Sequence, residues 1–186
     1  MLSRIGTFLR ETGKTLVVSL VIVWIVRSFI VQPFYVRGAS MEPNFEDHEY
    51  LIINEVSYRF NEPERGDVVV FRYPLNPSEF FIKRVIGLPN ETVAVESGRI
   101  VIKNDAWPEG RLLEEPYLPA GTATHGEVRL TLGSDQYYVL GDNRASSSDS
   151  RRWGPLKRSH IVGKTWLRGW PVSRLGIIEA PEYASP

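Results

Sequence analysis

Residues 67–73, DVVVFRY, and residues 80–86, FFIKRVI, are two runs of β-branched and aromatic side chains, separated by a break that contains Pro74 and Pro77. Runs of this length and composition are typical of β-strands, and the Pro and Asn residues between them are typical of turns. Similar runs recur at residues 49–54, 92–95, 99–102, 136–140 and 162–167. Turn-forming residues at 96–98 and 132–135 predict that the strands on either side of each turn pair with one another.

The rest of the chain adds little helical signal, because no second long helical period and no internal repeat appear after residue 36. Residues 108–126 have the composition of an irregular excursion. The sequence therefore predicts a mainly β fold, an antiparallel sheet or barrel-like domain whose strand order the pattern does not give.

The composition excludes several classes of protein. The chain has 186 residues, with 22 Lys and Arg against 22 Asp and Glu, so its formal net charge is zero. Nucleic-acid-binding proteins normally carry a basic excess, so no nucleic acid is expected as a partner. The absence of cysteine excludes disulfides, zinc–thiolate sites and a cysteine nucleophile. The three histidines (His48, His125 and His160) lack the spacing of metal ligands, so we expect no metal and no cofactor.

An apolar run near the N-terminus, Thr15–Val31 (TLVVSLVIVWIVRSFIV), is broken only by Ser19, Arg27 and Ser28. As a helix it would be about 25 Å long, at the short end of what a bilayer core requires. A buried core helix and an interfacial helix both require an amphipathic period, which the run lacks. A cleavable signal peptide requires small residues soon after the run, which are also missing. We therefore expect an uncleaved transmembrane anchor.

The charges around the apolar run predict its orientation. Arg4, Arg10 and Lys14 precede it, whereas residues 42–49 are acidic. By the positive-inside rule, the N-terminus lies in the cytoplasm and the bulk of the chain lies outside a single-pass membrane protein. The predicted organisation is a cytoplasmic segment, an anchor with its interfacial exit, a β-rich extracytoplasmic domain and a frayed tail, at residues 1–14, 15–36, 37–179 and 180–186.

Three segments carry candidate chemistry, and each has an ordinary structural alternative. In RGASMEP, residues 37–43, Ser40 has an unhindered hydroxyl and a backbone N–H that can face an oxyanion, although serine in such a turn is usually only a turn residue. In FFIKRVIGLP, residues 80–89, strand alternation points one of Lys83 and Arg84 where apolar side chains point, although an edge strand also uses lysine against aggregation. The loop at residues 141–154, GDNRASSSDSRRWG, is a solvated turn or a buried ion-pair frame formed by Asp142, Arg144, Asp149 and Arg151.

Together these segments resemble the bacterial signal peptidase I family of membrane-anchored Ser-Lys endopeptidases. The resemblance extends from the predicted anchor to about Trp170 and rests on motifs that occur in the family's order. They are Gly38-x-Ser40-Met41-x-Pro43, RGDVVVF at 65–71, IKRVIGLP at 82–89, EPYL at 115–118 and GDNR at 141–144 with DSR at 149–151. The sequence departs from the family where Gly38 replaces a serine that assists the oxyanion hole, and where Asn44-Phe45 replaces Thr-Leu.

The resemblance implies a role for each matching residue. Ser40 would be the nucleophile and its backbone N–H an oxyanion donor, and Lys83 would be the general base. Ser147 would orient that base, and Asp149 and Arg151 would form a structural ion pair. The family cleaves exported preproteins after small residues at positions −1 and −3, which extended peptides present by strand addition. The shallow pockets for these residues would be lined by Phe34, Val36 and Ile82.

The Ser-Lys pair also makes a physical demand of its own. Lysine accepts a proton only when it is neutral, and its unperturbed pKa is roughly 10.4. Burial among the neighbouring apolar residues of the 80–86 strand can lower that pKa by about 3 units. Three alternatives stay open at this point: His48 as the base, a membrane-anchored β-domain that only binds partners, and a Ser-Lys protein that cleaves its own chain.

Overall fold

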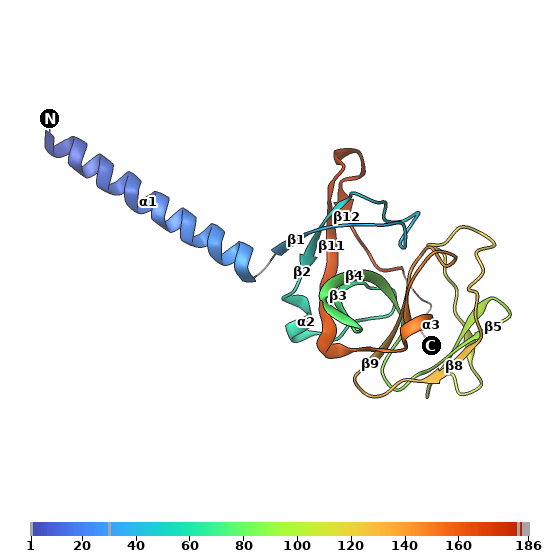
Figure 1. Cartoon of the computed structure of the whole chain (residues 1–186). Helices are drawn as coiled ribbons and strands as arrows, with labels where there is room; N and C mark the ends of the chain where they lie inside the picture. Colours follow the sequence, from blue (N-terminus) through green and yellow to red (C-terminus); the bar gives the residue numbers. More distant parts are fainter. Residues whose placement is uncertain (1, 30, 182, 184–186) are drawn as a thin grey trace.

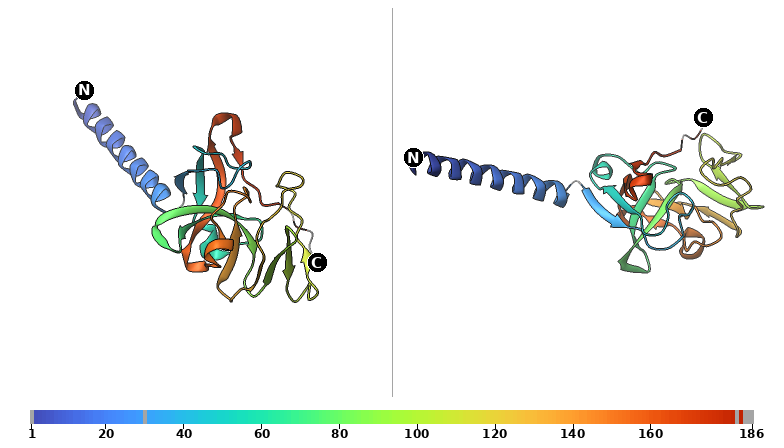
Figure 2. Two further views of the ribbon diagram at one scale, coloured as in Figure 1. Left: turned by 45° about the vertical axis from the view of Figure 1, so that its right-hand side comes forward. Right: turned by 90° about the horizontal axis from the view of Figure 1, so that it is seen from above.

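The computed structural model describes residues 2–29, 31–181 and 183. Helix α1 (Leu2–Phe29) stands apart from a β-rich body in every view (Figures 1 and 2). Across these described residues, none of the helices combines the length and the apolar character that crossing a membrane requires. Directly after α1, Val31–Tyr35 forms strand β1, which pairs with Tyr50–Asn54.

The larger of two sheets has eight strands and carries most of the body. Its hydrogen-bonded order is β1-β2-β11-β3-β4-β9-β10, and β12 pairs with β11. All of its pairings are antiparallel. Its strands are β1 (Val31–Tyr35), β2 (Tyr50–Asn54), β3 (Val68–Tyr73), β4 (Asn76–Gly87), β9 (Gln136–Leu140), β10 (Leu156–Lys157), β11 (Ile161–Trp170) and β12 (Gly176–Ile177).

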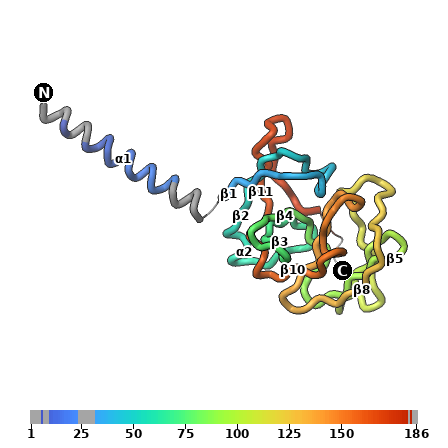
Figure 3. Tube along the Cα trace, viewed as in Figure 1, coloured from blue at the N-terminus to red at the C-terminus, as the bar shows by residue number. Residues whose placement is uncertain are grey.

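The smaller sheet has four antiparallel strands in the order β7-β6-β5-β8. It lies on the side of the body that is away from α1, where β5 and β8 are labelled (Figure 3). Its strands are β5 (Thr92–Glu96), β6 (Arg99–Lys103), β7 (Arg111–Leu112) and β8 (Val128–Thr131). The remaining elements are short helices: α2 (Ser57–Phe60), α3 (Ser150–Trp153), η1 (Arg158–His160) and η2 (Val172–Arg174).

Strand β3 shows why its sequence is a continuous apolar run rather than an alternating one. Val69 and Phe71 pack into one hydrophobic cluster, whereas Val68 and Val70 pack into another on the opposite face. When both faces of a strand are buried, successive side chains are all apolar, and the sequence does not alternate with polar residues. Lys83 lies opposite the fully buried Val69 in the β3–β4 register, so the pairing with β3 places this lysine beside a buried strand.

The predicted mainly β fold of antiparallel strands is confirmed, and each predicted run lies within or overlaps an observed strand. The barrel-like closure is wrong, because β1 and β10 are the two ends of the larger sheet and no pairing among the described residues joins them. The pairing predicted across residues 132–135 is also wrong: β8 pairs with β5, and β9 pairs with β4 and β10. That turn passes the chain from one sheet to the other, which its local composition does not reveal.

The predicted tail contains residues that pack on the body. Pro181 and Tyr183 lie against Gly66, so closely that a Cβ on this glycine would meet Tyr183 Cε2 at 2.7 Å. Gly66 has a φ of +90°, a backbone conformation that favours glycine. These two residues of the predicted tail therefore lie against the β-rich body.

Candidate active site

Ser40 lies in the turn-rich loop between β1 and β2. Met41 and Phe45 are buried in the hydrophobic cluster beneath the loop and attach it to the sheet. Gly38 has a φ of +89°, and its N–H donates a hydrogen bond to Asp47 Oδ1 at 2.9 Å. Within the described part of the chain, the Ser40 N–H has no acceptor, so this donor is available to an incoming oxygen.

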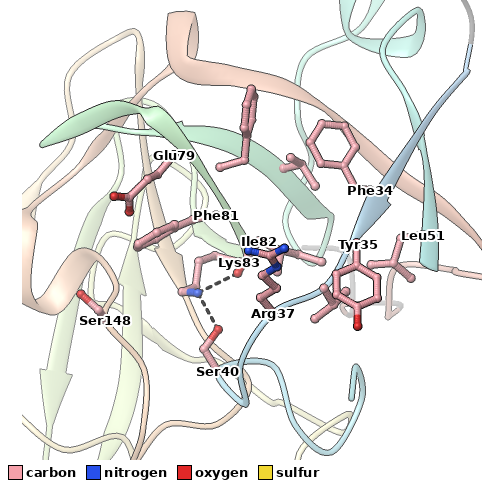
Figure 4. A pocket seen from close by; sticks show the side chains of 13 residues that line it. Phe34, Tyr35, Arg37, Ser40, Leu51, Glu79, Phe81, Ile82, Lys83 and Ser148 are labelled. Atoms are coloured by element: carbon pink, nitrogen blue, oxygen red, sulfur yellow. Dashed lines mark hydrogen bonds between the residues drawn. The ribbon is translucent and has the colours of Figure 1, made fainter. Parts of the chain in front are cut away.

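Lys83 reaches Ser40 from strand β4. Its Nζ lies 2.8 Å from Ser40 Oγ and 2.8 Å from the backbone oxygen of Ile82 (Figure 4). The residue is only 3% exposed, and Nζ lies 5.4 Å from the centre of the Phe81 ring. The structure thus brings together the two residues that the sequence singled out from separate segments.

Burial governs the protonation of this lysine. It lowers the pKa of Lys83 from 10.5 to about 8, because a charged ammonium loses its hydration in the apolar strand environment. The carboxylates of Asp149 and Asp142 act in the opposite direction and stabilise the charged form. A substantial fraction of Lys83 is therefore neutral at slightly alkaline pH and able to accept a proton from Ser40.

The loop after β9 holds the Ser40 loop in place. The Asn143 backbone N–H donates to Ser40 O at 3.1 Å, and its side-chain amide donates to Ala39 O at 3.0 Å. Gly141 packs against Ser147 and against the Ser40 backbone oxygen, and a Cβ at this position would meet Ser147 Cβ at 2.6 Å. Only glycine fits between these two segments.

Buried ion pairs surround the site, as one of the two interpretations of the 141–154 loop predicts, but Asp142 and Arg144 pair with residues outside the loop. Arg84 forms a two-pronged pair with Asp142, with N–O distances of 2.9 and 2.6 Å. Arg144 pairs with Glu115 from the irregular segment. These contacts connect the loop to strand β4 and to residues 115–117.

Asp149 and Arg151 form a second two-pronged pair, in which both N–O distances are 2.8 Å. Burial opposes ionisation of Asp149, but Arg151 and the N–H of Gly141 outweigh it and lower the pKa of this carboxyl. Asp149 also caps helix α3 by accepting a hydrogen bond from the Arg151 backbone N–H. The ionised carboxylate therefore fixes the end of the loop that carries Ser147.

Two candidates from the sequence make no hydrogen bond to Lys83 among the described residues. Ser147 Oγ is buried, and among the described residues it makes no hydrogen bond to Lys83, whose Nζ donates to Ser40 and Ile82. His48 lies 3.1 Å from Asp47 and packs its ring against Tyr35, and it does not line the groove at Ser40. The geometry therefore favours Lys83 over His48 as the partner of Ser40.

A groove of about 540 Å³ extends from Ser40 and Lys83 between β1 and β4. Phe34, Val36 and Ile82 are among its lining residues, and Figure 4 labels Phe34 and Ile82 beside Ser40 and Lys83. Phe34 also packs edge-to-face against Phe80, with ring centres 5.4 Å apart. The sequence did not single out other lining residues, which are Tyr35, Arg37, Leu51, Val70, Glu79, Phe80, Phe81 and Ser148.

The sequence analysis also missed the connections that hold the site together. Asn44 donates to Asp142 Oδ2 at 2.8 Å and to the backbone oxygen of Tyr117 at 2.9 Å. The Arg84 guanidinium stacks over the Tyr117 ring at 4.0 Å. The one signal in the sequence was that Asn44 departs from the family's usual residue.

Comparison with known proteins agrees with the motifs. The family model described as "Signal peptidase, peptidase S26" matches residues 9–170. The chain is 38% identical to a probable signal peptidase I-2 of Synechocystis sp., over 90% of this chain and 76% of that protein. It is 41% identical to a signal peptidase I of Leptolyngbya laminosa, over 93% of this chain and 85% of that protein.

A crystal structure of a signal peptidase I from Enterococcus faecalis V583 covers 56% of this chain and 97% of its own, at 30% identity and a TM-score of 0.47. The resemblance carried by the sequence motifs is confirmed by the family match and by the two relatives. This chain belongs to the signal peptidase family, peptidase S26.

Proposed function

We propose that this chain is a membrane-bound serine endopeptidase that removes N-terminal signal peptides from exported preproteins, with Ser40 as nucleophile and Lys83 as general base. One observation carries the assignment of these residues: a lysine only 3% exposed lies 2.8 Å from a serine hydroxyl at the end of a groove. A buried amine with a lowered pKa beside a hydroxyl is the arrangement that activates a serine.

In the first step, neutral Lys83 accepts the Ser40 hydroxyl proton while Oγ attacks the scissile carbonyl carbon. The carbonyl π electrons move to oxygen, and the resulting oxyanion accepts a hydrogen bond from the Ser40 N–H. The lysine, now an ammonium, donates its proton to the leaving amine as the C–N bond breaks. The mature protein leaves, and the signal peptide stays attached to Ser40 as an ester.

In the second step, Lys83 is neutral again and takes a proton from a water molecule that attacks the ester. The tetrahedral intermediate collapses with breakage of the bond to Ser40 Oγ, which recovers its proton from the lysine. The signal peptide leaves with a new carboxylate, and no cofactor or metal enters the proton and electron balance of either step. We further propose that Ser147 steadies the lysine once substrate has displaced solvent from the groove.

The same groove supports a preference for small residues at positions −1 and −3. Ile82 and Val70 lie opposite one another in the β3–β4 register and share the apolar wall of the groove with Val36. An extended peptide added beside β4 would turn alternate side chains towards this wall, which leaves little depth for large groups. Glycine or alanine fits such a wall with the least displacement.

Cleavage of a preprotein by the detergent-solubilised chain tests the proposal. We expect the wild type to release the mature protein and Ser40→Ala to release none while it still binds the preprotein. A chain that binds without cleaving is a binding module. Cleavage of its own chain, with the preprotein left intact, identifies a self-processing Ser-Lys protein instead.

We also propose that α1 attaches the chain to a lipid bilayer, with residues 1–14 on the cytoplasmic side. The proposal rests on the apolar run at residues 15–31 and on the exposure of Leu16, Leu20 and Val23, which are 59–61% exposed. Flotation with liposomes tests attachment, and protease protection in vesicles distinguishes a spanning segment from an interfacial one. A chain that stays with the soluble fraction at high salt and lacks protection contradicts the proposal.

A further inference from the structure

Asn44 connects four segments of the chain at one point. Its side-chain amide donates to Asp142 Oδ2 at 2.8 Å and to Tyr117 O at 2.9 Å. Its own backbone oxygen accepts hydrogen bonds from Arg168 and, at 3.1 Å, from Arg174. Glu49, at the end of the same loop, also binds Arg168 and Arg174, but among the described residues only Asn44 joins these arginines to Asp142 and Tyr117.

The position of Asn44 gives these contacts a consequence for the catalytic pair. The Asn143 N–H donates to the backbone oxygen of Ser40, and the Asn44 side chain, four residues later in the same loop, donates to Asp142. Residues 142 and 143 therefore bind the Ser40 loop at two points. Asp142 in turn pairs with Arg84, which follows Lys83 on β4. The connection therefore runs from the loop of the nucleophile to the strand of the base without entering the groove.

We infer that Asn44 is a positioning residue that sets the register of the Ser40 loop against the Lys83 strand through its hydrogen bond to Asp142. The inference rests on the proposed function and adds to it a residue that touches neither substrate nor the reacting atoms. It also gives a reason for the departure at this position, because an amide reaches both the Asp142 carboxylate and the Tyr117 carbonyl.

Charge adds a second effect of the same contact. The carboxylates of Asp149 and Asp142 both favour the ammonium form of Lys83. Asp149 is paired with Arg151, whereas Arg84 and the Asn44 amide both place positive hydrogens against Asp142. Without the amide, more of the negative potential of Asp142 acts on Lys83. The charged form is then stabilised, and the pH at which the base becomes neutral rises.

The test compares Asn44→Leu, which keeps the approximate volume and removes both donors, with wild type in preprotein cleavage. We expect kcat to fall about ten-fold or more, because a misplacement of about 1 Å costs on the order of a hundred-fold. We expect KM to change little and the acidic limb of the pH–rate profile to move to higher pH. Asn44→Thr retains one hydrogen-bond donor, so its kcat should lie between those of Asn44→Leu and wild type. It also serves as the test variant if Asn44→Leu does not fold.

Asn104→Leu is the matched control. Asn104 donates to the buried carboxylate of Glu91 at 2.8 Å, and Glu91 pairs with Arg65 at 2.6 Å, as Asp142 pairs with Arg84. This arrangement lies beside the smaller sheet, so its loss should reduce stability and leave kcat and the pH profile unchanged. Equal kinetics for the Asn44 and Asn104 variants overturn the inference, and a wild type that does not cleave overturns the proposed function instead.

Discussion

Lys83 and Arg84 are adjacent on β4 but have partners of different charge. Lys83 Nζ donates to the hydroxyl of Ser40 at 2.8 Å, whereas Arg84 pairs with the carboxylate of Asp142 at 2.6 Å. Both side chains are almost completely buried, with exposures of 3% and 4%. The Asp142 carboxylate compensates the charge of Arg84, whereas Lys83 donates its hydrogen bonds to two neutral groups, the Ser40 hydroxyl and the backbone oxygen of Ile82. This difference keeps one cation permanently charged and leaves the other able to lose its proton.

Replacement of Lys83 by methionine is expected to abolish cleavage, because methionine retains the buried volume but has no basic atom to accept the Ser40 proton. The circular dichroism spectrum should be unchanged. Lys157→Met, at an exposed position on β10, is the control and should cleave at the wild-type rate. A Lys83 variant with normal turnover would remove this lysine from the mechanism.

The rate should rise with pH through about 8. The base functions only when it is neutral, and burial lowers the pKa of Lys83 to about 8, so activity is low at pH 6 and approaches its plateau above pH 9. The pH profile of kcat/KM for a peptide substrate measures this directly. A profile that is flat from pH 6 to pH 9 contradicts the assignment of the base.

Lys83 should make the fold less stable at neutral pH. Its folded pKa of about 8 lies below the unfolded value of 10.5, so below pH 8 the folded chain must hold a buried charge that the unfolded chain hydrates freely. The difference corresponds to about 3 kcal/mol, which disappears as the pH rises from 8 to above 10.5. Denaturant unfolding of wild type and Lys83→Met should show the variant more stable at pH 7, with a gap that closes at high pH. A gap independent of pH would contradict the shift.

Gly141→Ala is expected to remove activity. The added methyl group would overlap Ser147 and the Ser40 backbone oxygen, and the backbone atom cannot rotate away. The Ser40 loop must then move, which costs about 1–3 kcal/mol of stability and misplaces the nucleophile. Gly176→Ala, where nothing lies within 4 Å of the new atom, is the control. Normal cleavage by the Gly141 variant would show that the two segments are not locked together.

Substrate choice should follow the apolar wall formed by Val36, Ile82 and Val70. A preprotein with leucine at −1 should be cleaved at least ten-fold more slowly than one with alanine, because the larger side chain does not fit a shallow pocket. Ile82→Ala should reduce this ratio by enlarging the pocket. Equal rates for both preproteins with wild type would show that the wall does not select.

Local sequence patterns predicted the strands, and sequence motifs predicted the pair Ser40 and Lys83, which the structure brings within hydrogen-bond distance. The run at residues 67–73 forms β3 because its apolar side chains pack into hydrophobic clusters on both faces of the sheet. The spacing and the type of neighbouring side chains are enough to predict such a strand. Ser40 and Lys83 were predicted from several motifs that occur together in the order of the signal peptidase I family, because the segment of each residue taken alone has an ordinary structural alternative. Each of these motifs lies within a few neighbouring positions, so it can be read without the fold.

The pairing of the strands and the contacts that hold the Ser40 loop against β4 became known only from the packing of the whole chain. The turn at residues 132–135 joins two sheets rather than two paired strands, and Asp142 finds Arg84 and Asn44 at separations of 58 and 98 residues. The same holds for Arg144 and Glu115, which are 29 residues apart. Such partners depend on the packing of distant segments, and no local pattern of side chains specifies them.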